Sequence, residues 1–506
     1  MDIRIEKKSE VYITITGETS VLYELQDVFT FYADGYKYHP KVRAKIWDGK
    51  IRLLKLLSKN RGELYFGLLG EVIKFCKNRG YTFELSDDLK IKNMPSNEEL
   101  ENFTKHIDLY SKGERIELRD YQVKGFIEAV QRKRCLVLSP TSSGKSAVIY
   151  TISRYLLEQN KRGLIIVPNV TLIHQLHNDF IDYSSNNGWS VDDFVHKIFA
   201  GQDKNSSKSL HLSTWQSLMT IKEQSHFEKY DFVIIDEAHG IKGTELTKIL
   251  EKCVYADYRI GLTGTTDNVK ANINTIIGLT GSIIRLTTTK ELMERNEVSN
   301  LNIKCLILKY DEEIKKVFAK KKIKYQDEIK YLVSNTKRNN FIKNLAFSLN
   351  SNTIILTHLV ECHGKVLYEL LCNSIHKKDR NIYFIHGGVD SKEREQVRQI
   401  METESNAIIV ASVQTMGTGV SIKNLHNIIF ATNGKSSIRV LQSIGRVLRL
   451  HHSKDSATVY DIVDDISYKK SKNFTLQHFL ERVKYYNSEQ FNYTLKNITF
   501  SETKND

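Results

Sequence analysis

The chain has 506 residues, of which 41% are apolar, so it can bury several cores, and its length favours about three domains. Lysine and arginine number 74 against 60 aspartates and glutamates. A net charge of +14 favours a polyanion such as nucleic acid over a merely solvated basic surface. Six scattered cysteines without metal-ligand spacing argue against disulfides and zinc, and no apolar run is long enough for a membrane span. We therefore expect a cytoplasmic protein with no membrane partner.

The first 85 residues have the pattern of a small α/β domain. Alternating side chains over 11–16 predict a strand, and helical spacing over 21–29 predicts a helix. Asp48-Gly49 predicts a hairpin turn between two basic and apolar runs. The polar stretch 86–97 is expected to be a linker, with a helix beginning at its end.

Seven short apolar runs follow, separated by helical patterns. They are Cys135–Leu138, Leu164–Val167, Phe232–Ile235, Ile260–Thr263, Ile354–Thr357, Ile408–Ala411 and Ile428–Ala431. Continuous apolar strands that alternate with helices indicate parallel sheets covered on both faces. The runs form two sets, which predicts one lobe over 98–305 and a second over 306–506.

The most informative motif is a phosphate-binding loop, Pro140-Thr141-Ser142-Ser143-Gly144-Lys145-Ser146. It follows a predicted strand and precedes a helical pattern, which is the context that a P-loop requires. A chance Gly-Lys-Ser at a helix start is disfavoured because strand, loop and helix occur together. Lys145 is expected at the β- and γ-phosphates and Ser146 at Mg²⁺. The nucleotide-binding residues predicted here are Thr141, Ser142, Ser143, Gly144, Lys145 and Ser146.

Two carboxylates end the third apolar run. Asp236 is expected to hold Mg²⁺, and Glu237 to orient and deprotonate the attacking water. Alone, such a pair is usually a solvated strand end, but beside a P-loop it indicates ATP hydrolysis. His239 either links this site to the Thr263-Gly264-Thr265 loop or is an ordinary surface histidine.

Two arginines far down the chain complete the catalytic set. Arg446 and Arg449 lie three residues apart, so on a helix they share one face. They could be arginine fingers for the γ-phosphate, or part of a solvated basic face. The neighbouring Gln442 and Gly445 favour the catalytic interpretation.

This set of motifs resembles superfamily 2 helicases over roughly residues 115–465. The segment Arg119-Asp120-Tyr121-Gln122 resembles an adenine-reading motif, and Gly264 departs from the Ser-Ala-Thr form of the third motif in many relatives. The resemblance implies nucleotide contacts at Gln122, Gly419 and Ser421. It implies nucleic-acid contacts at Asn169, Thr214, Thr357 and Thr415.

A closer resemblance covers nearly the whole chain. The segments Asp34–Pro40 and Trp47–Leu53, with the ending near Phe491-Asn492-Tyr493, resemble the UvsW-type recombination helicases of T4-like phages. That family implies an enzyme in the cytoplasm of a host cell. It implies ATP-driven remodelling of branched DNA, such as Holliday junctions, D-loops, R-loops and stalled forks.

The N-terminal domain also suggests nucleic-acid binding from its residues alone. Basic side chains alternate with aromatic ones, which suits phosphates and bases respectively. The predicted contacts are Lys41, Arg43, Lys45, Trp47 and Arg52. For Trp47, packing in the core is an equal alternative.

The sequence thus predicts an α/β protein with a small N-terminal DNA-binding domain and two RecA-like lobes. ATP and Mg²⁺ are the expected cofactors, and branched, duplex and single-stranded DNA the expected partners. We expect a monomer, and leave RNA–DNA hybrids and a small accessory protein open as partners. Two alternatives are the motor subunit of a restriction-type system and a DNA annealing or binding protein with secondary ATPase.

Overall fold

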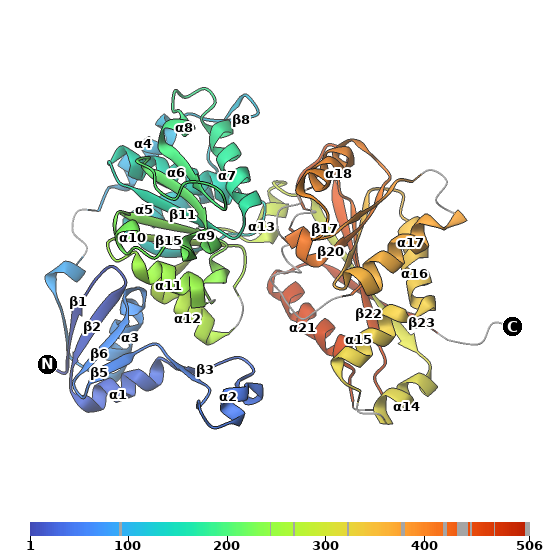
Figure 1. The fold of residues 1–506 in the computed structure, drawn as a ribbon, viewed down its shortest axis with the longest axis horizontal. Coiled ribbons are helices and arrows are strands. Elements are labelled where there is room, and N and C mark those ends of the chain that lie inside the picture. The colour runs from blue at the N-terminus through green and yellow to red at the C-terminus, as the bar shows by residue number, and fades with distance from the viewer. Residues whose placement is uncertain are drawn as a thin grey trace. The chain divides into compact units, whose positions relative to one another are not determined.

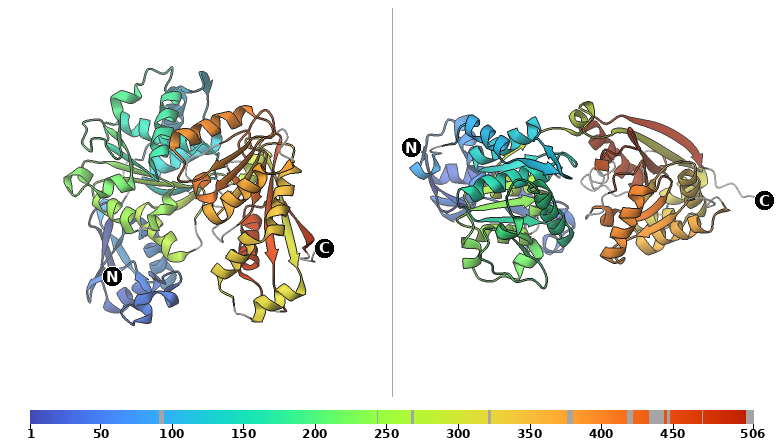
Figure 2. Two further views of the ribbon diagram at one scale, coloured as in Figure 1. Left: turned by 45° about the vertical axis from the view of Figure 1, so that its right-hand side comes forward. Right: turned by 90° about the horizontal axis from the view of Figure 1, so that it is seen from above.

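The computed structural model describes residues 1–90, 94–242, 244–266, 269–320, 323–375, 380–417, 422–432, 444–445, 448–469 and 471–500. The chain forms two compact units, Met1–Thr287 and Thr288–Asp506 (Figures 1 and 2). The first unit contains the N-terminal domain and lobe 1, and the second is lobe 2. Within the described residues, no helix is long and apolar enough to cross a membrane.

The N-terminal domain is built on a five-stranded mixed sheet of order β5-β6-β2-β1-β7. The sheet is antiparallel except where β1 pairs with β7. Helix α3 ends at Gly80, whose φ of 75° suits glycine. The elements are β1 (Ile3–Lys7), β2 (Tyr12–Gly17), α1 (Thr19–Val28), β5 (Lys55–Ser58), β6 (Arg61–Tyr65), η2 (Phe66–Leu68), α3 (Leu69–Arg79), β7 (Phe83–Leu85) and η3 (Asp87–Leu89).

A basic arm, residues 30–52, leaves this domain beside its sheet (Figure 1). It contains β3 (Thr30–Tyr32), η1 (Tyr36–Tyr38), α2 (Pro40–Arg43) and β4 (Lys50–Arg52). The predicted hairpin at Asp48-Gly49 is wrong, because β4 pairs with the distant β3. Pro40 starts a helix instead, and the Nε1 of Trp47 donates to the carbonyl of Lys50 at 3.0 Å.

Lobe 1 is a seven-stranded parallel sheet of order β12-β13-β11-β14-β15-β10-β16. Its strands are β10 (Arg134–Leu138), β11 (Gly163–Val167), β12 (Val195–Ile198), β13 (Leu210–Thr214), β14 (Phe232–Asp236), β15 (Tyr258–Thr263) and β16 (Ser282–Arg285). The four strands predicted here, β10, β11, β14 and β15, are confirmed, and all are buried.

Helices cover both faces of this sheet (Figure 1). One group contains α5, α6 and α7, and the other contains α9, α11 and α12. The remaining elements of lobe 1 are α4 (Asn97–His106), β8 (Leu109–Ser111), β9 (Glu114–Ile116), α5 (Asp120–Arg132), α6 (Lys145–Glu158), α7 (Val170–Tyr183), α8 (Val191–Phe194), α9 (Trp215–Met219), α10 (Ser225–Glu228), η4 (Ala238–Lys242), α11 (Thr244–Lys252) and α12 (Lys270–Leu279).

A fully buried arginine joins the second group of helices to the sheet. Arg259, in β15, donates to the carbonyls of Leu250 at 2.8 Å and Cys253 at 2.9 Å, at the end of α11. It also donates to the carbonyl of Leu279 at 2.8 Å, at the end of α12. Helix C-termini carry unpaired carbonyls and partial negative charge, so one guanidinium satisfies two helix ends.

The N-terminal domain packs on these same two helices. The hydroxyls of Tyr12 and Tyr65 both donate to Oε1 of Glu251, in α11, at 2.7 and 2.8 Å. Gly67 lies so close to α12 that a Cβ there would be 2.0 Å from the carbonyl oxygen of Ile277. Residues of the domain and of lobe 1 share one buried apolar cluster, so the two form one unit.

Lobe 2 is a second seven-stranded parallel sheet, of order β19-β20-β18-β21-β22-β17-β23. Its elements are α13 (Thr289–Glu294), β17 (Asn300–Tyr310), α14 (Glu312–Lys320), α15 (Tyr325–Ser334), α16 (Thr336–Phe347), β18 (Thr353–Thr357), the π-helix η5 (Val360–Lys365), α17 (Val366–Cys372), β19 (Ile382–Ile385), α18 (Ser391–Thr403), β20 (Ile408–Ser412), α19 (Val413–Gly417), β21 (Asn427–Phe430), β22 (Ser456–Asp465), α21 (Phe474–Ser488) and β23 (Tyr493–Phe500). The three strands predicted in this half, β18, β20 and β21, are confirmed.

The expected boundary between the lobes differs from the division of the structure. A break at 305/306 would cut through β17, which pairs with β22 and β23 along its length. The second unit instead begins with the capping box of α13, where Thr288 and Glu291 exchange hydrogen bonds. The expected linker 86–97 holds η3, whose Leu89 packs in the N-terminal core, and Ser96, which caps α4.

We predict that Arg259→Leu lowers the free energy of unfolding of the first unit by about 3–5 kcal/mol, because three buried carbonyls lose their donor. Urea unfolding of the full chain measures this loss. Arg61→Leu, at an exposed position of β6, is the matched control and should change stability by about 0.5 kcal/mol or less. Equal stability of the two variants would show that Arg259 does not join the helix ends.

Candidate functional site

The P-loop lies between the end of β10 and the start of α6. Gly144 precedes α6 with a φ of 78°, and a Cβ there would meet Nε2 of Gln122 at 2.3 Å, so only glycine fits. The Nζ of Lys145 donates to the carbonyls of Ser139 and Pro140, both at 3.2 Å. The lysine therefore lies over the loop whose amides bind phosphate in proteins of this kind.

The predicted adenine contact, Gln122, is buried and supports the loop. Its Oε1 accepts from the backbone N–H of Arg119 at 2.9 Å, and its Nε2 donates to the carbonyl of Ser143 at 2.9 Å. The hydroxyl of Tyr121 donates to the same carbonyl at 3.1 Å. Contact with adenine stays a prediction, and the amide holds the P-loop backbone in this structure.

The two predicted carboxylates lie at the end of β14, near the P-loop. Burial and the neighbouring Glu237 raise the pKa of Asp236 to about 6, against the opposing effect of Lys145. The backbone N–H of Glu237 donates to Oδ1 of Asp236 at 2.9 Å. Glu237 has a φ of 52°, a costly conformation for a side chain with a Cβ, and such strain is common at functional sites.

His239 joins the carboxylates to the loop after β15. Its Nδ1 lies 3.2 Å from Oε2 of Glu237 and 3.0 Å from Oγ1 of Thr263. The backbone N–H of Ser139 donates to the carbonyl of Thr263 at 3.0 Å, so the same threonine also contacts the P-loop. Of the two interpretations of His239, the linking one agrees with these contacts.

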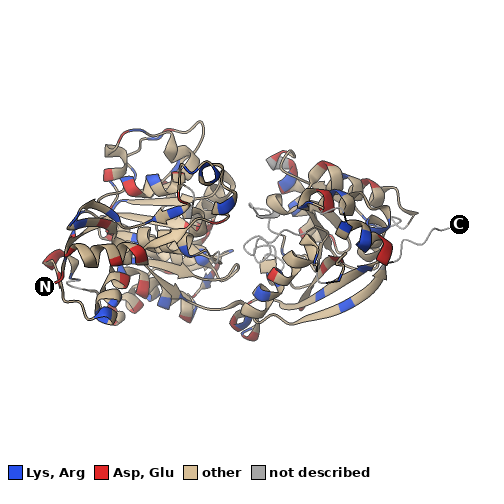
Figure 3. Ribbon diagram, turned by 90° about the horizontal axis from the view of Figure 1, so that it is seen from below, with Lys and Arg blue, Asp and Glu red and all other residues tan. Residues whose placement is uncertain are grey.

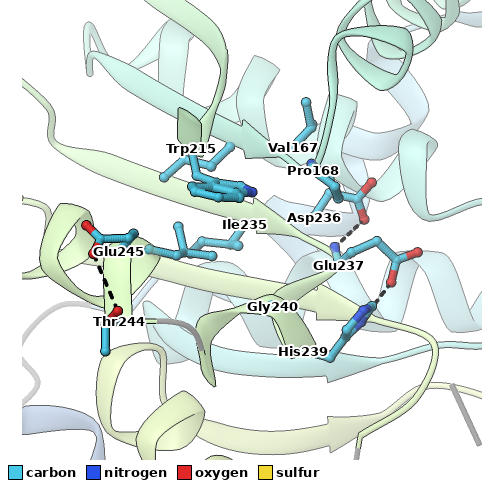
Figure 4. Close-up of a pocket in the computed structure, with 12 residues that line it drawn as sticks. Val167, Pro168, Trp215, Ile235, Asp236, Glu237, His239, Gly240, Thr244 and Glu245 are labelled. Atoms are coloured by element: carbon cyan, nitrogen blue, oxygen red, sulfur yellow. Dashed lines mark hydrogen bonds and ion pairs between the residues drawn. The ribbon is translucent and has the colours of Figure 1, made fainter. Parts of the chain in front are cut away.

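A cavity of about 330 Å³ opens beside the carboxylates (Figure 4). Its walls include Pro168 after β11, Trp215 of α9 and Ile235 of β14. Asp236 and Glu237 border it as well. The cavity is therefore lined both by the predicted catalytic carboxylates and by the two segments predicted to contact nucleic acid.

Those two segments lie at the carboxyl ends of adjacent strands of the sheet. Val167, the last residue of β11, is the register partner of Thr214, the last residue of β13. Asn169 follows β11 by two residues and so lies at the same edge of the sheet. Asn169 caps α7 by accepting from the N–H of Leu172, and Thr214 caps α9 by accepting from that of Ser217. The Thr214 side chain is buried. A phosphate here would meet helix N-termini rather than the Thr214 hydroxyl.

Two residues of lobe 2 that were predicted to contact nucleic acid have buried side chains. Thr357 is fully buried at the end of β18, and Thr415 is buried with its hydroxyl 2.6 Å from that of Ser412. The carbonyl of Arg449 accepts from the hydroxyl of Ser299 at 3.4 Å. Three other residues, Gly419, Ser421 and Arg446, lie outside the described part of the chain.

The contacts predicted on the basic arm lie mainly at its surface. Lys41, Arg43, Lys45 and Arg52 are exposed, and Arg52 pairs with Asp48. Trp47 is half-buried, with its ring edge-on to His39 at 5.2 Å between centroids. Its indole N–H donates to a carbonyl within the arm, so these contacts favour the structural interpretation of Trp47.

No sequence motif identified Tyr183, which contacts the predicted metal ligand Ser146. Its hydroxyl lies 2.9 Å from Oγ of Ser146, and its ring packs against Tyr150 at 5.5 Å. Burial raises the pKa of Tyr183 to about 12, so it keeps its proton at neutral pH. A serine hydroxyl that binds a cation through oxygen needs an acceptor for its hydrogen, and this phenol can serve.

Family models match three parts of the chain. The model "DNA helicase UvsW, N-terminal" covers residues 2–86, "Type III restriction enzyme, res subunit" covers 115–268, and "Helicase conserved C-terminal domain" covers 336–451. The ATP-dependent DNA helicase uvsW of Enterobacteria phage T4 is 34% identical over 98% of this chain and 100% of its own length. The chain belongs to the UvsW family of ATP-dependent DNA helicases.

Solved structures agree with this family. The crystal structure of T4 UvsW matches with a TM-score of 0.52 and 33% identity, over 99% of this chain and all of that one. A putative HsdR subunit of a type I restriction enzyme from Vibrio vulnificus matches with a TM-score of 0.56 but 17% identity, over 85% of this chain and 74% of that one. The second likeness shows the shared fold alone.

A further relative was found by sequence. A putative helicase of a Sulfolobus islandicus filamentous virus is 25% identical over 74% of this chain and 69% of its own length.

We predict that Tyr183→Phe weakens the affinity for nucleotide in the presence of Mg²⁺ by about three- to tenfold, the equivalent of one hydrogen bond. Affinity without Mg²⁺ should change little, because the Tyr183 hydroxyl bonds to the expected metal ligand and to no other side chain among the described residues. Titration of a fluorescent ATP analogue with and without Mg²⁺ separates the two.

The matched control is Tyr150→Phe. It removes a hydroxyl from the same aromatic cluster, where it contacts Arg154 and Asn187 rather than Ser146. If both variants lose affinity equally with and without Mg²⁺, Tyr183 has only a structural role.

Proposed function

We propose that this chain is an ATP- and Mg²⁺-dependent motor that remodels branched DNA in recombination and repair. The observation that carries the proposal is the carboxyl edge of the lobe 1 sheet. That edge holds the P-loop, the β14 carboxylates and the N-termini of α7 and α9, so ATP and nucleic acid would bind along one edge.

The residues on this edge fit a magnesium nucleotide. Lys145 would bind the β- and γ-phosphates, Ser146 and Asp236 would hold Mg²⁺, and Glu237 would orient the attacking water. Among the described residues, no group of three His, Cys, Asp or Glu side chains could hold a metal alone. A cation supplied with the nucleotide, with phosphate oxygens as further ligands, suits a site with one hydroxyl and one carboxylate. Bound Mg²⁺ would neutralise charge on the transferring phosphoryl group.

Lobe 2 would complete hydrolysis through its arginines. Arg446 and Arg449 are proposed as arginine fingers, which stabilise the charge of the transition state. Gly419 and Ser421 are proposed to contact nucleotide. These roles rest on the motifs and on membership of the family, not on contacts within the described residues.

The basic arm is the proposed contact for branched DNA. Figure 3 shows basic and acidic residues interspersed over both units, so net charge alone does not identify a surface. The arm differs because its exposed cations lie among exposed apolar side chains. Tyr38 and Ile46 are each 76% exposed, and the guanidinium of Arg43 lies 6.0 Å from the Tyr38 ring. Exposed aromatics beside cations suit bases and phosphates together.

The proposed partners follow from this assignment. The chain would bind branched, duplex and single-stranded DNA as a monomer in the cytoplasm of the host cell. RNA–DNA hybrids and a small accessory protein are further candidate partners.

We predict that forked and four-way DNA stimulate ATP hydrolysis more than linear duplex or single strands of equal length. Steady-state ATPase with the four substrates side by side measures this, with Lys145→Ala as the variant that should lose hydrolysis. Lys145→Ala should still bind DNA, because the Lys145 ammonium donates to the carbonyls of Ser139 and Pro140 and lies on none of the surfaces proposed to bind DNA. No stimulation by any DNA would contradict the proposed function, and cut DNA in these reactions would favour a restriction-type motor.

We predict that replacing Lys41, Arg43, Lys45 and Arg52 together by Ala weakens binding to forked DNA. The plot of log affinity against log salt should become shallower by about 3, because each phosphate contact adds roughly 0.9. Three of the four cations, all but Arg52, form no ion pair with a residue that the structure describes. Fluorescence anisotropy over a salt series measures both quantities.

The control replaces Lys59, Arg61 and Lys77, which are exposed on the same domain outside the arm. ATP hydrolysis at saturating DNA should match wild type in the arm variant. If the salt slope and the affinity of the arm variant equal those of the control, the arm is only a solvated surface and does not bind DNA.

A further inference from the structure

A groove of about 380 Å³ separates the N-terminal domain from α12 of lobe 1. Residues of α1, β3 and α3 form one side, and the first turns of α12 form the other. The groove exists because the N-terminal domain packs on α12, where Gly67 allows the close approach described above. No sequence motif marks this surface, since its residues come from segments about two hundred positions apart.

The charge of the groove is positive. Lys74, Arg79 and Lys270 line it, against one acidic residue, Glu71. Arg79 is 3.2 Å from Glu24 and so is partly neutralised. Lys74 and Lys270 are exposed, and neither forms an ion pair with any residue in the described part of the chain. With Arg79 paired to Glu24 and Glu71 set against the two lysines, the lining keeps a net positive charge, which favours a bound polyanion.

The lining of the groove suits a nucleotide more than an isolated anion. Phe31 contributes a half-buried ring, and Val28 is 45% exposed. The amide of Asn78 adds hydrogen-bonding groups to the same lining. Cations together with an accessible aromatic surface and amides are the usual components of single-strand binding surfaces.

The groove is continuous with the basic arm, because β3, which carries Phe31, is the first strand of that arm. We infer that the groove binds a DNA strand that leaves a branch point held by the arm. This inference rests on the proposed function. Through Lys270 the strand would contact the start of α12, only a few residues after the Thr263 loop that joins the P-loop to His239.

The test is the full-length double variant Lys74→Ala/Lys270→Ala with forked DNA that has single-stranded arms. We expect affinity on the order of tenfold lower at 0.1 M salt, and a salt slope shallower by roughly 1.4–1.8 for two lost contacts. The control is Lys59→Ala/Lys77→Ala. Lys77 lies on α3 with Lys74 but is not part of the groove. Melting temperature verifies the fold of both variants.

A second measurement keeps Lys74 and Lys270 and so decides the question even if the double variant is unstable. A photo-crosslinking amino acid at Asn78 should crosslink forked DNA, and the same amino acid at Lys77 should not. Wild-type affinity of the double variant, losses equal to those of the control, or equal crosslinking from both positions would each overturn the inference. If DNA still stimulates wild-type hydrolysis in that case, the proposed function stands and only the groove is rejected.

Discussion

The contacts of Arg259 are the constraint on which the first unit depends. Its guanidinium fixes the ends of α11 and α12, and these helices carry Glu251 and Gly278, on which the N-terminal domain packs. Thr263, at the other end of the same strand, contacts His239 beside the predicted catalytic carboxylates. One buried cation in β15 therefore connects the base of the N-terminal domain with the strand that supports this candidate site.

The adjacent strand, β10, also carries an arginine that contacts the N-terminal domain. Arg134 of β10 is the register partner of Arg259 and forms an ion pair with Glu10 of the N-terminal domain. Its guanidinium also lies 4.1 Å from the ring of Phe66. Burial and the nearby Arg259 lower the pKa of Arg134 to about 10, so it remains charged at neutral pH. The strand that leads to the P-loop thus begins in contact with the N-terminal domain.

The sequence predicted what depends on local patterns and failed where distant segments meet. Apolar runs identified most of β10, β11, β14 and β15, because a strand buried on both faces is mainly apolar. The same runs missed the first residues of β10 and β15, where Arg134 and Arg259 lie. The P-loop and carboxylates were also recognisable, since their chemistry requires particular residues at fixed spacing. The arm was mistaken for a hairpin because its strands pair across residues 33–49, and pairing over that distance leaves no local signal.

The positions of individual side chains were harder to predict. Thr214 and Thr415 are expected to contact nucleic acid, but both side chains are buried. The Thr214 hydroxyl, at the end of β13, caps α9, and the Thr415 hydroxyl, in α19, bonds to that of Ser412. Tyr183 reaches Ser146 only because α6 and α7 pack side by side, which spacing along the chain does not encode. Sequence motifs therefore indicate where a site lies, whereas the packing of helices and strands determines which side chains surround it.

The contact between Gly67 and α12 limits how this chain could be recombined with its relatives. A Cβ on Gly278 would lie 2.8 Å from Cβ of Tyr65, so both backbones must match the opposite surface closely. An N-terminal domain taken from another helicase would need an α12 whose surface matches it. An α12 taken from another helicase would in turn need a C-terminal end that places its carbonyl against Arg259. The unit of exchange in a chimera is therefore the whole of Met1–Thr287, not the small domain that the sequence delimits at residue 85.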